Sequence, residues 1–181
     1  MFECLLERIA LSCDSVRIPY MIVGGQAVLL YGEPRLTKDI DITLGVGLER
    51  LPDVLKLVHE VRLEALVDPE VFTRQTMVLP CSDPATGIRV DLIFSFSPYE
   101  RLAISRSRTV RIGGADVRFA SLEDLIIHKV IAGRPRDLED AKSVLAKNPA
   151  ADRIYIRHWL NEFASALGED FLSRLDSIND V

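Results

Sequence analysis

The first 120 residues alternate short apolar runs, which suit strands, with segments whose apolar side chains recur at helical spacing. Residues 2–13 have the helical spacing, whereas Tyr20–Val23 is a compact apolar run that stops at two glycines. Residues 37–44 alternate polar and apolar side chains, as a strand with one buried face does. The same patterns predict further strands over 73–80, 88–94, 108–112 and 116–119 and further helices over 26–31 and 48–62.

From Ser121 onward the strand pattern disappears and helical spacing takes its place. Ser121 with acids in the following turn is typical of a helix start, and helices are also expected over 137–146 and 151–166. We therefore expect an α/β protein of the α+β kind, with a small mixed sheet flanked by helices. Residues 1–120 would form this core, and residues 121–181 would form a C-terminal helical region packed on it.

The chain has 181 residues, 48% of them hydrophobic, which suits one domain or one domain with a helical appendage. Its net charge of −5 argues against broad, nonspecific coating of nucleic acid, although it allows a local basic patch. The three cysteines, Cys4, Cys13 and Cys81, form no disulfide framework. This cysteine pattern favours a reducing cytoplasm. Since the residues after Met1 lack a basic segment and a long apolar run, we expect no signal peptide and no membrane span.

Three aspartates in the predicted strands are the first candidates for chemistry. Asp39 and Asp41 occupy alternate positions and so point to the same side of their strand, and Asp91 interrupts the apolar run 88–94. Such carboxylates repel one another and lose hydration, which a divalent cation offsets. If the two strands are neighbours, the three carboxylates converge and suit two magnesium ions with a nucleoside triphosphate. In the structural alternative, Asp39 and Asp41 lie in solvent and Arg89 pairs with Asp91.

Gly24 and Gly25 stand between a predicted strand and a predicted helix. Glycine lets the backbone approach a phosphate closely, and the start of a helix offers free N–H groups to an anion. The same two residues also suit an ordinary turn, so they indicate function only in combination with the aspartates.

The order of these motifs resembles the DNA polymerase beta-like nucleotidyltransferase superfamily over residues 20–145. It is most similar to the AbiEii-type toxins and related small bacterial nucleotidyltransferases, which carry glycine at the position of Gly25, where other members often have serine. The motifs that carry the resemblance are Gly24-Gly25, then Arg35-x-Thr37-x-Asp39-x-Asp41, then an acid on a later strand.

The resemblance implies a role for each motif residue. Asp39 and Asp41 would hold two Mg²⁺ ions, and Asp91 would hold the catalytic ion and help to deprotonate the acceptor hydroxyl. Gly24, Gly25 and the following helix start would bind the triphosphate.

The helical region extends the resemblance through His128-Lys129 and the run Arg134-Pro135-Arg136-Asp137-Leu138-Glu139-Asp140-Ala141. It implies that Lys129 contacts the triphosphate and that Asp137 orients Lys129 or another basic residue. From the residues alone, Lys129 also suits an exposed surface position, and Asp137 also suits the start of a helix.

Arg35 and Thr37 are further candidates for nucleotide binding. Arg35 suits a phosphate clamp, or a structural pair with Asp39 or Glu33, and Thr37 suits a local hydrogen bond in its strand. Five arginines also gather along one stretch and suit a solvated face, or a surface for an acidic acceptor such as RNA. These are Arg101, Arg106, Arg108, Arg111 and Arg118.

Together these implications describe a metal-dependent nucleotidyltransferase that moves an NMP from an NTP to a hydroxyl of RNA, such as transfer RNA, of a protein or of a small molecule. They also imply a toxin whose partner is an antitoxin protein. The alternative is a catalytically degenerate nucleotidyltransferase-like module that acts by binding a protein partner. Retention of all three aspartates argues against that alternative.

Overall fold

The computed structural model describes residues 2–95 and 97–179, and the chain divides into two compact units. The first unit comprises Met1–Gln26 and Thr37–Ala120, and the second comprises Ala27–Leu36 and Ser121–Val181. The second unit thus takes in residues 27–36, which the sequence pattern alone grouped with the sheet.

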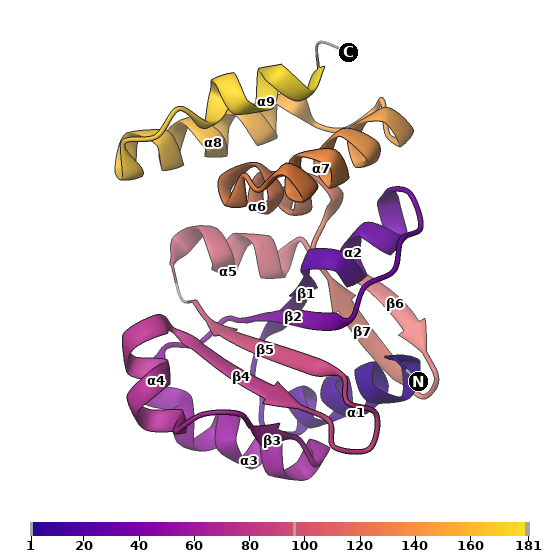
Figure 1. Cartoon of the computed structure of the whole chain (residues 1–181), viewed down its shortest axis with the longest axis vertical. Coiled ribbons are helices and arrows are strands. Elements are labelled where there is room, and N and C mark those ends of the chain that lie inside the picture. Colours follow the sequence, from indigo (N-terminus) through magenta and orange to yellow (C-terminus); the bar gives the residue numbers. More distant parts are fainter. Residues whose placement is uncertain (1, 96, 180–181) are drawn as a thin grey trace. The chain divides into compact units, whose positions relative to one another are not determined.

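Within the described residues, the first unit is built on a mixed seven-stranded sheet with the order β3-β4-β5-β2-β1-β7-β6 (Figure 1). β2 is parallel to β5 and antiparallel to β1, and β1 is parallel to β7. The mixed α/β fold class predicted from the sequence is confirmed. The strands are β1 (Tyr20–Val23), β2 (Asp39–Leu44), β3 (Glu64–Ala65), β4 (Val78–Ser82), β5 (Arg89–Phe94), β6 (Arg108–Ile112) and β7 (Ala115–Phe119).

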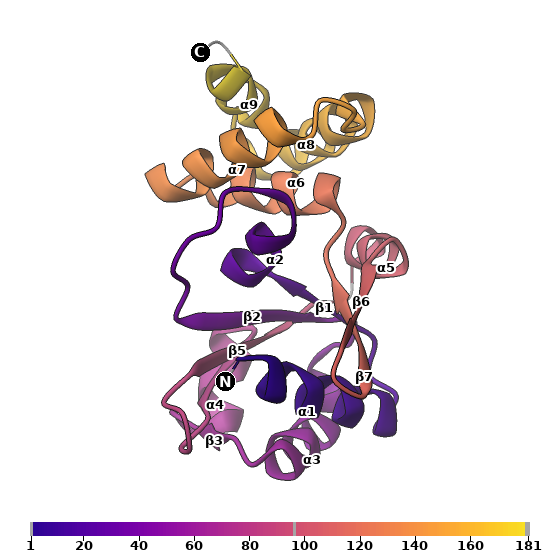
Figure 2. The ribbon, with the colours of Figure 1, turned by 90° about the vertical axis from the view of Figure 1, so that its right-hand side faces the viewer.

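Helices α1 and α3 lie side by side on one face of this sheet (Figures 1 and 2). Ser12 of α1 donates a hydrogen bond of 2.7 Å to Glu60 of α3. In α1 the buried side chains, among them Leu5 and Ile9, recur at helical spacing, which confirms the amphipathic helix predicted there. The first unit contains the helices α1 (Phe2–Ser15), α3 (Leu51–Val61), α4 (Pro69–Thr76) and α5 (Pro98–Ser105), and the short 3-10 helix η1 (Leu48–Arg50).

The register between β2 and β5 is set by apolar burial. Ile42 pairs with Leu92, and both side chains are fully buried, as is Ile40. Burying one such side chain stabilises the fold by about 1.5–3 kcal/mol. A slip of one residue would turn all of them to the opposite face. The same register places Asp41 directly opposite Asp91.

The predicted strand over 73–80 is wrong in its first half, where α4 continues to Thr76 and β4 begins only at Val78. Asp68 accepts a hydrogen bond from the Val71 N–H at 2.9 Å, and Pro69 occupies the first turn. This N-cap and proline start a helix that the apolar pattern does not reveal. Helix α5, strand β3 and helix α9 were likewise not predicted.

The second unit is helical. It contains α6 (Leu122–Ala132), α7 (Pro135–Lys147), α8 (Arg153–Leu167) and α9 (Phe171–Asn179), together with the part of α2 (Gly24–Tyr31) that follows Gln26. Asn148 donates to the Tyr31 carbonyl at 2.9 Å, and Lys147 pairs with Glu33 at 2.8 Å. These contacts tie residues 27–36 to α7.

In the part of the chain that the structure describes, no helix combines the length and apolarity needed to cross a membrane.

Candidate active site

The three predicted aspartates lie on one face of two adjacent strands. Asp41 and Asp91 are register partners on the parallel strands β2 and β5, and Asp39 lies two residues before Asp41. Side chains two apart in a strand share a face, so all three carboxylates project from the same side of the sheet. Asp39 is exposed, and the other two are half-buried.

Arg89 is the cation that these carboxylates share. Its Nε donates to Asp91 Oδ1 at 3.0 Å, while its side chain remains 55% exposed. The pKa of Arg89 is raised, first by the hydrogen bond to Asp91, then by the charge of Asp91, and further by the charges of Asp39 and Asp41. The strand pairing therefore concentrates negative charge around one exposed guanidinium.

This arrangement includes two features of the structural alternative, since Asp39 is exposed and Arg89 pairs with Asp91. Among the described residues, no group of three or more His, Cys, Asp or Glu side chains is gathered tightly enough to hold a metal ion. The donors themselves are nonetheless carboxylate oxygens, which are the ligands that Mg²⁺ prefers. The register also brings the half-buried carboxylates of Asp41 and Asp91 opposite each other, and their like charges repel.

Gly24 provides the second element of the site. Its φ is +63°, and a Cβ added to it would lie 1.9 Å from Asp41 Oδ2. No residue with a side chain fits there, so the sequence needs glycine both for the turn and for the close approach of Asp41. The predicted helix begins two residues earlier than expected, at Gly24 itself, and Gly25 lies in its first turn. The Asp41 carboxylate therefore lies against the start of α2.

The strand predicted over 37–44 begins only at Asp39, so Thr37 lies just before β2, and its Oγ1 makes the expected local hydrogen bond by donating to the Asp39 carbonyl at 3.3 Å. This bond steadies the backbone that leads into Asp39.

The other predicted site residues belong to a buried charge cluster in the second unit. Lys129 Nζ lies 2.8 Å from Asp137 Oδ1 and 2.8 Å from Asp140 Oδ2. Arg35 binds Asp140 through two hydrogen bonds of 2.8 Å, and Arg134 Nε binds Asp137 at 2.6 Å. Lys129, Arg35 and Arg134 thus each bind one or both of two buried carboxylates.

Lys129 is only 6% exposed, so the surface-lysine alternative is wrong. Burial raises the pKa of Asp140, but hydrogen bonds from Arg35 and Lys129 and the charges of both residues outweigh it and hold that pKa below its usual range. The pKa of Asp137 is lowered in the same way, with burial opposed by Arg134 and Lys129. Both carboxylates therefore stay charged and hold Lys129 from two sides.

This cluster differs from expectation in the partner of Arg35 and in the presence of Asp140. Arg35 pairs with Asp140, neither with Asp39 nor with Glu33. Asp140 itself was not among the predicted site residues, although its spacing of three from Asp137 puts both on one face of α7. That spacing is the signal by which it could have been found.

The sequence over residues 5–179 matches the family described as "Nucleotidyl transferase AbiEii toxin, Type IV TA system". The chain belongs to the AbiEii family. Among curated proteins, none matches its sequence. The predicted resemblance to AbiEii-type nucleotidyltransferases is confirmed, and the protein is an enzyme of the nucleotidyltransferase class.

Solved structures share the fold of this AbiEii protein. The solution structure of the antibiotic-resistance factor ANT(2'')-Ia has a TM-score of 0.62 at 16% identity, covering 92% of this chain and 94% of that chain. An antigenic nucleotidyltransferase-like protein from Paracoccidioides brasiliensis has a TM-score of 0.58 at 17% identity, and the match covers 96% of this chain and 91% of that chain. ANT(2'')-Ia in complex with adenylyl-2''-tobramycin has a TM-score of 0.60 at 18% identity, and the match covers 86% of this chain and 94% of that chain.

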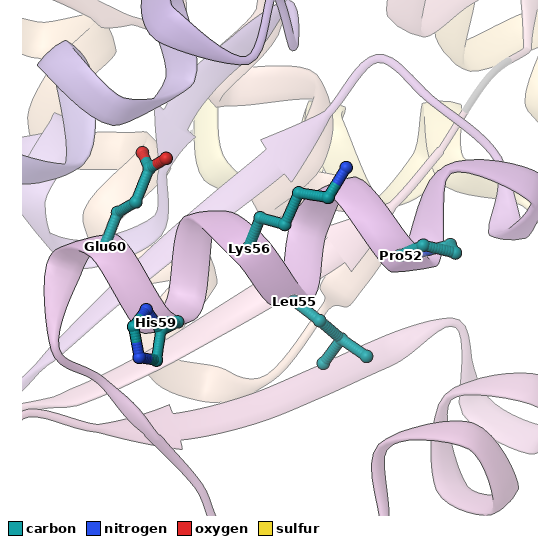
Figure 3. A pocket seen from close by; sticks show the side chains of 5 residues that line it. All are labelled: Pro52, Leu55, Lys56, His59 and Glu60. Atoms are coloured by element: carbon teal, nitrogen blue, oxygen red, sulfur yellow. The ribbon is translucent and has the colours of Figure 1, made fainter.

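Two other surface features lie outside the AbiEii motifs. A pocket of about 370 Å³ is lined by Pro52, Leu55, Lys56, His59 and Glu60, all on α3 (Figure 3), and it contains no predicted site residue. In the arginine-rich stretch, Arg111 pairs with Asp116 and Arg118 pairs with Asp14. These pairs reduce the positive charge of that stretch and favour the solvated face over a binding surface for RNA.

Proposed function

We propose that this AbiEii protein transfers an NMP from an NTP to an acceptor hydroxyl in a magnesium-dependent reaction. The acceptor oxygen attacks the α-phosphorus, the bond from this phosphorus to the oxygen of the β-phosphate breaks, and pyrophosphate leaves. The observation that supports the proposal most is the register of Asp41 with Asp91 beside the turn at Gly24.

The carboxylates of the first unit have the central role in this proposal. Asp39 and Asp41 would hold two Mg²⁺ ions, and Asp91 would hold the catalytic one. Bound magnesium supplies positive charge to the phosphate oxygens and to the leaving pyrophosphate. Asp91 would accept the proton of the acceptor hydroxyl, and its ion pair with Arg89, whose side chain is 55% exposed, would have to open for this role.

The triphosphate is bound by backbone and cationic groups. The N–H groups at the start of α2, next to Gly24 and Gly25, bind phosphate oxygens. Lys129 neutralises triphosphate charge, and Asp137 holds its ammonium group in place. Arg35 contributes positive charge, and Thr37 positions the strand that carries Asp39.

The acceptor is an RNA such as transfer RNA, a protein or a small molecule, and the protein works in the cytoplasm. The family description names a toxin of a type IV toxin–antitoxin system, which favours a cellular macromolecule as the target and an antitoxin protein as a partner. ANT(2'')-Ia was solved with adenylyl-2''-tobramycin, which keeps a small-molecule hydroxyl among the candidates.

One observation supports the alternative function, a degenerate module that only binds a protein partner. The pair of Arg89 with Asp91 partly neutralises the carboxylates without any metal. A module of that kind would show no magnesium-dependent affinity for nucleotides, so titration with each NTP in the presence and absence of Mg²⁺ separates the two functions.

The test of the proposed reaction is the double variant Asp39→Ala with Asp41→Ala. Each labelled NTP is incubated with Mg²⁺, cell extract and protein, and the labelled product is identified. We expect transfer by the wild type and none by the double variant, whereas Asp116→Ala, an exposed change on β7, keeps full activity. Transfer by the double variant would show that the assignment is wrong.

A further inference from the structure

Gln26 buries a carboxamide whose donor atom lacks a partner. The residue is 6% exposed, and among the residues that the structure describes its Nε2 has no hydrogen-bond partner. A buried donor without a partner costs free energy that a folded protein usually avoids. Thr73 Oγ1 is another such atom in the described chain, but it lies on α4, which carries no site residue.

Gln26 is the third residue of α2 and follows the two glycines directly. Side chains in a helix lean toward its N-terminus, and glutamine at the third position reaches back over the first turn, as it does in a capping box. That turn begins at Gly24, against which the Asp41 carboxylate packs. The position of Gln26 in the first turn therefore puts its amide near the end of α2 where the backbone N–H groups have no helical partners.

We propose that the Gln26 side-chain amide donates a hydrogen bond to a phosphate oxygen of the bound nucleoside triphosphate. Nε2 is only a donor, so the partner that it lacks is an acceptor, and the oxygens of a triphosphate are acceptors that carry no hydrogen. The inference rests on the proposed function, because it takes the triphosphate to bind at the start of α2. The free enzyme keeps this donor unpaired and desolvated, and the ligand satisfies it.

The substitution Gln26→Met keeps the length of the side chain and removes the donor. Calorimetric titration with each nucleoside triphosphate that the wild type binds, in the presence of Mg²⁺, should show affinity roughly tenfold or more lower. The melting temperature of the free variant should equal or exceed that of the wild type, because the unpaired donor is gone. Gln26→Leu is the second apolar variant if the methionine does not fold.

Gln75→Met is the matched control, because Gln75 is exposed on α4 of the same unit, and it should change neither quantity. Unchanged nucleotide affinity of the Gln26 variants overturns the inference. A loss that differs from one base to another also overturns it, since a phosphate contact is common to all NTPs. If the wild type itself binds no NTP, the proposed function fails and this inference fails with it.

Discussion

At Gly24 both the backbone conformation and the space beside Asp41 require glycine. A Cβ there would meet Asp41 Oδ2 at 1.9 Å, whereas a Cβ at Gly87, which has a similar φ of +71°, would meet nothing within 4 Å. Both positions impose the same strain on alanine. We predict that Gly24→Ala lowers the free energy of unfolding by about 2 kcal/mol more than Gly87→Ala does in urea titrations. Equal losses would contradict the close packing of Asp41 against this turn.

Asp140 holds two buried or half-buried cations at once, so its removal should be costly. We predict that Asp140→Asn lowers the free energy of unfolding by about 3 kcal/mol at neutral pH, because it leaves buried positive charge poorly compensated. The single tryptophan, Trp159 in α8, reports the unfolding of the same unit. Asp176→Asn, which breaks an exposed pair with Arg157, is the control and should cost about 0–1 kcal/mol.

The low pKa of Asp140 also fixes the sign of a pH effect. A carboxyl group whose pKa is lower in the folded than in the unfolded state contributes stability above the unfolded value, and this stability is lost as pH falls through the folded value. The free energy of unfolding of the wild type should therefore decrease on acidification below about pH 5. In Asp140→Asn the decrease should be smaller. Parallel curves for the two proteins would rule out this contribution.

The positions of individual site residues were predictable where a local sequence motif contains them. Gly24 and the aspartates of β2 follow from strand alternation and a turn. The partner of Arg35 was not predictable, because Asp140 lies 105 positions away and only the folded chain brings the two together. That the Gln26 amide is buried and has no hydrogen-bond partner was not predictable either, because the local sequence after the two glycines does not indicate burial.

At the scale of elements, the pairing of β2 with β5 creates the carboxylate cluster and leaves Arg89 as its shared cation. We predict that Arg89→Met lowers the melting temperature in the absence of divalent ions, and that millimolar Mg²⁺ then raises it by about 3 °C more than in the wild type. Arg111→Met removes a similarly exposed arginine from a β6–β7 ion pair and should leave the magnesium response unchanged. An equal response of Arg89→Met and wild type would argue against a cation site at these strands.

The elements themselves were predicted best where apolar periodicity was strong, as in α1 and β1. Helices α4 and α5 were missed because their apolar spacing is weak, although each begins with a capping side chain and a proline, at Asp68-Pro69 and Ser97-Pro98. Strand β3 has only two residues and is defined by its pairing with β4, so no local sequence pattern predicts it.

At the scale of the whole chain, the candidate residues fall in both compact units. The aspartates and Gly24 belong to the first, and the cluster around Lys129 belongs to the second. The family match over residues 5–179 includes both units, so the helical region is as much a part of the family as the sheet is. The shift in composition near residue 120 was visible in the sequence, but the grouping of residues 27–36 depends on long-range contacts such as that of Asn148 with Tyr31.

The most direct test of nucleotidyl transfer compares two labels on the same NTP, one on the α-phosphate and one on the γ-phosphate. The protein is incubated with Mg²⁺ and cell extract, and the labelled acceptor is isolated. We predict that the acceptor gains the α-label, never the γ-label, and that the Asp39→Ala, Asp41→Ala variant and chelation of Mg²⁺ each abolish the signal. Transfer of the γ-label, or of the α-label by the double variant, would contradict this prediction.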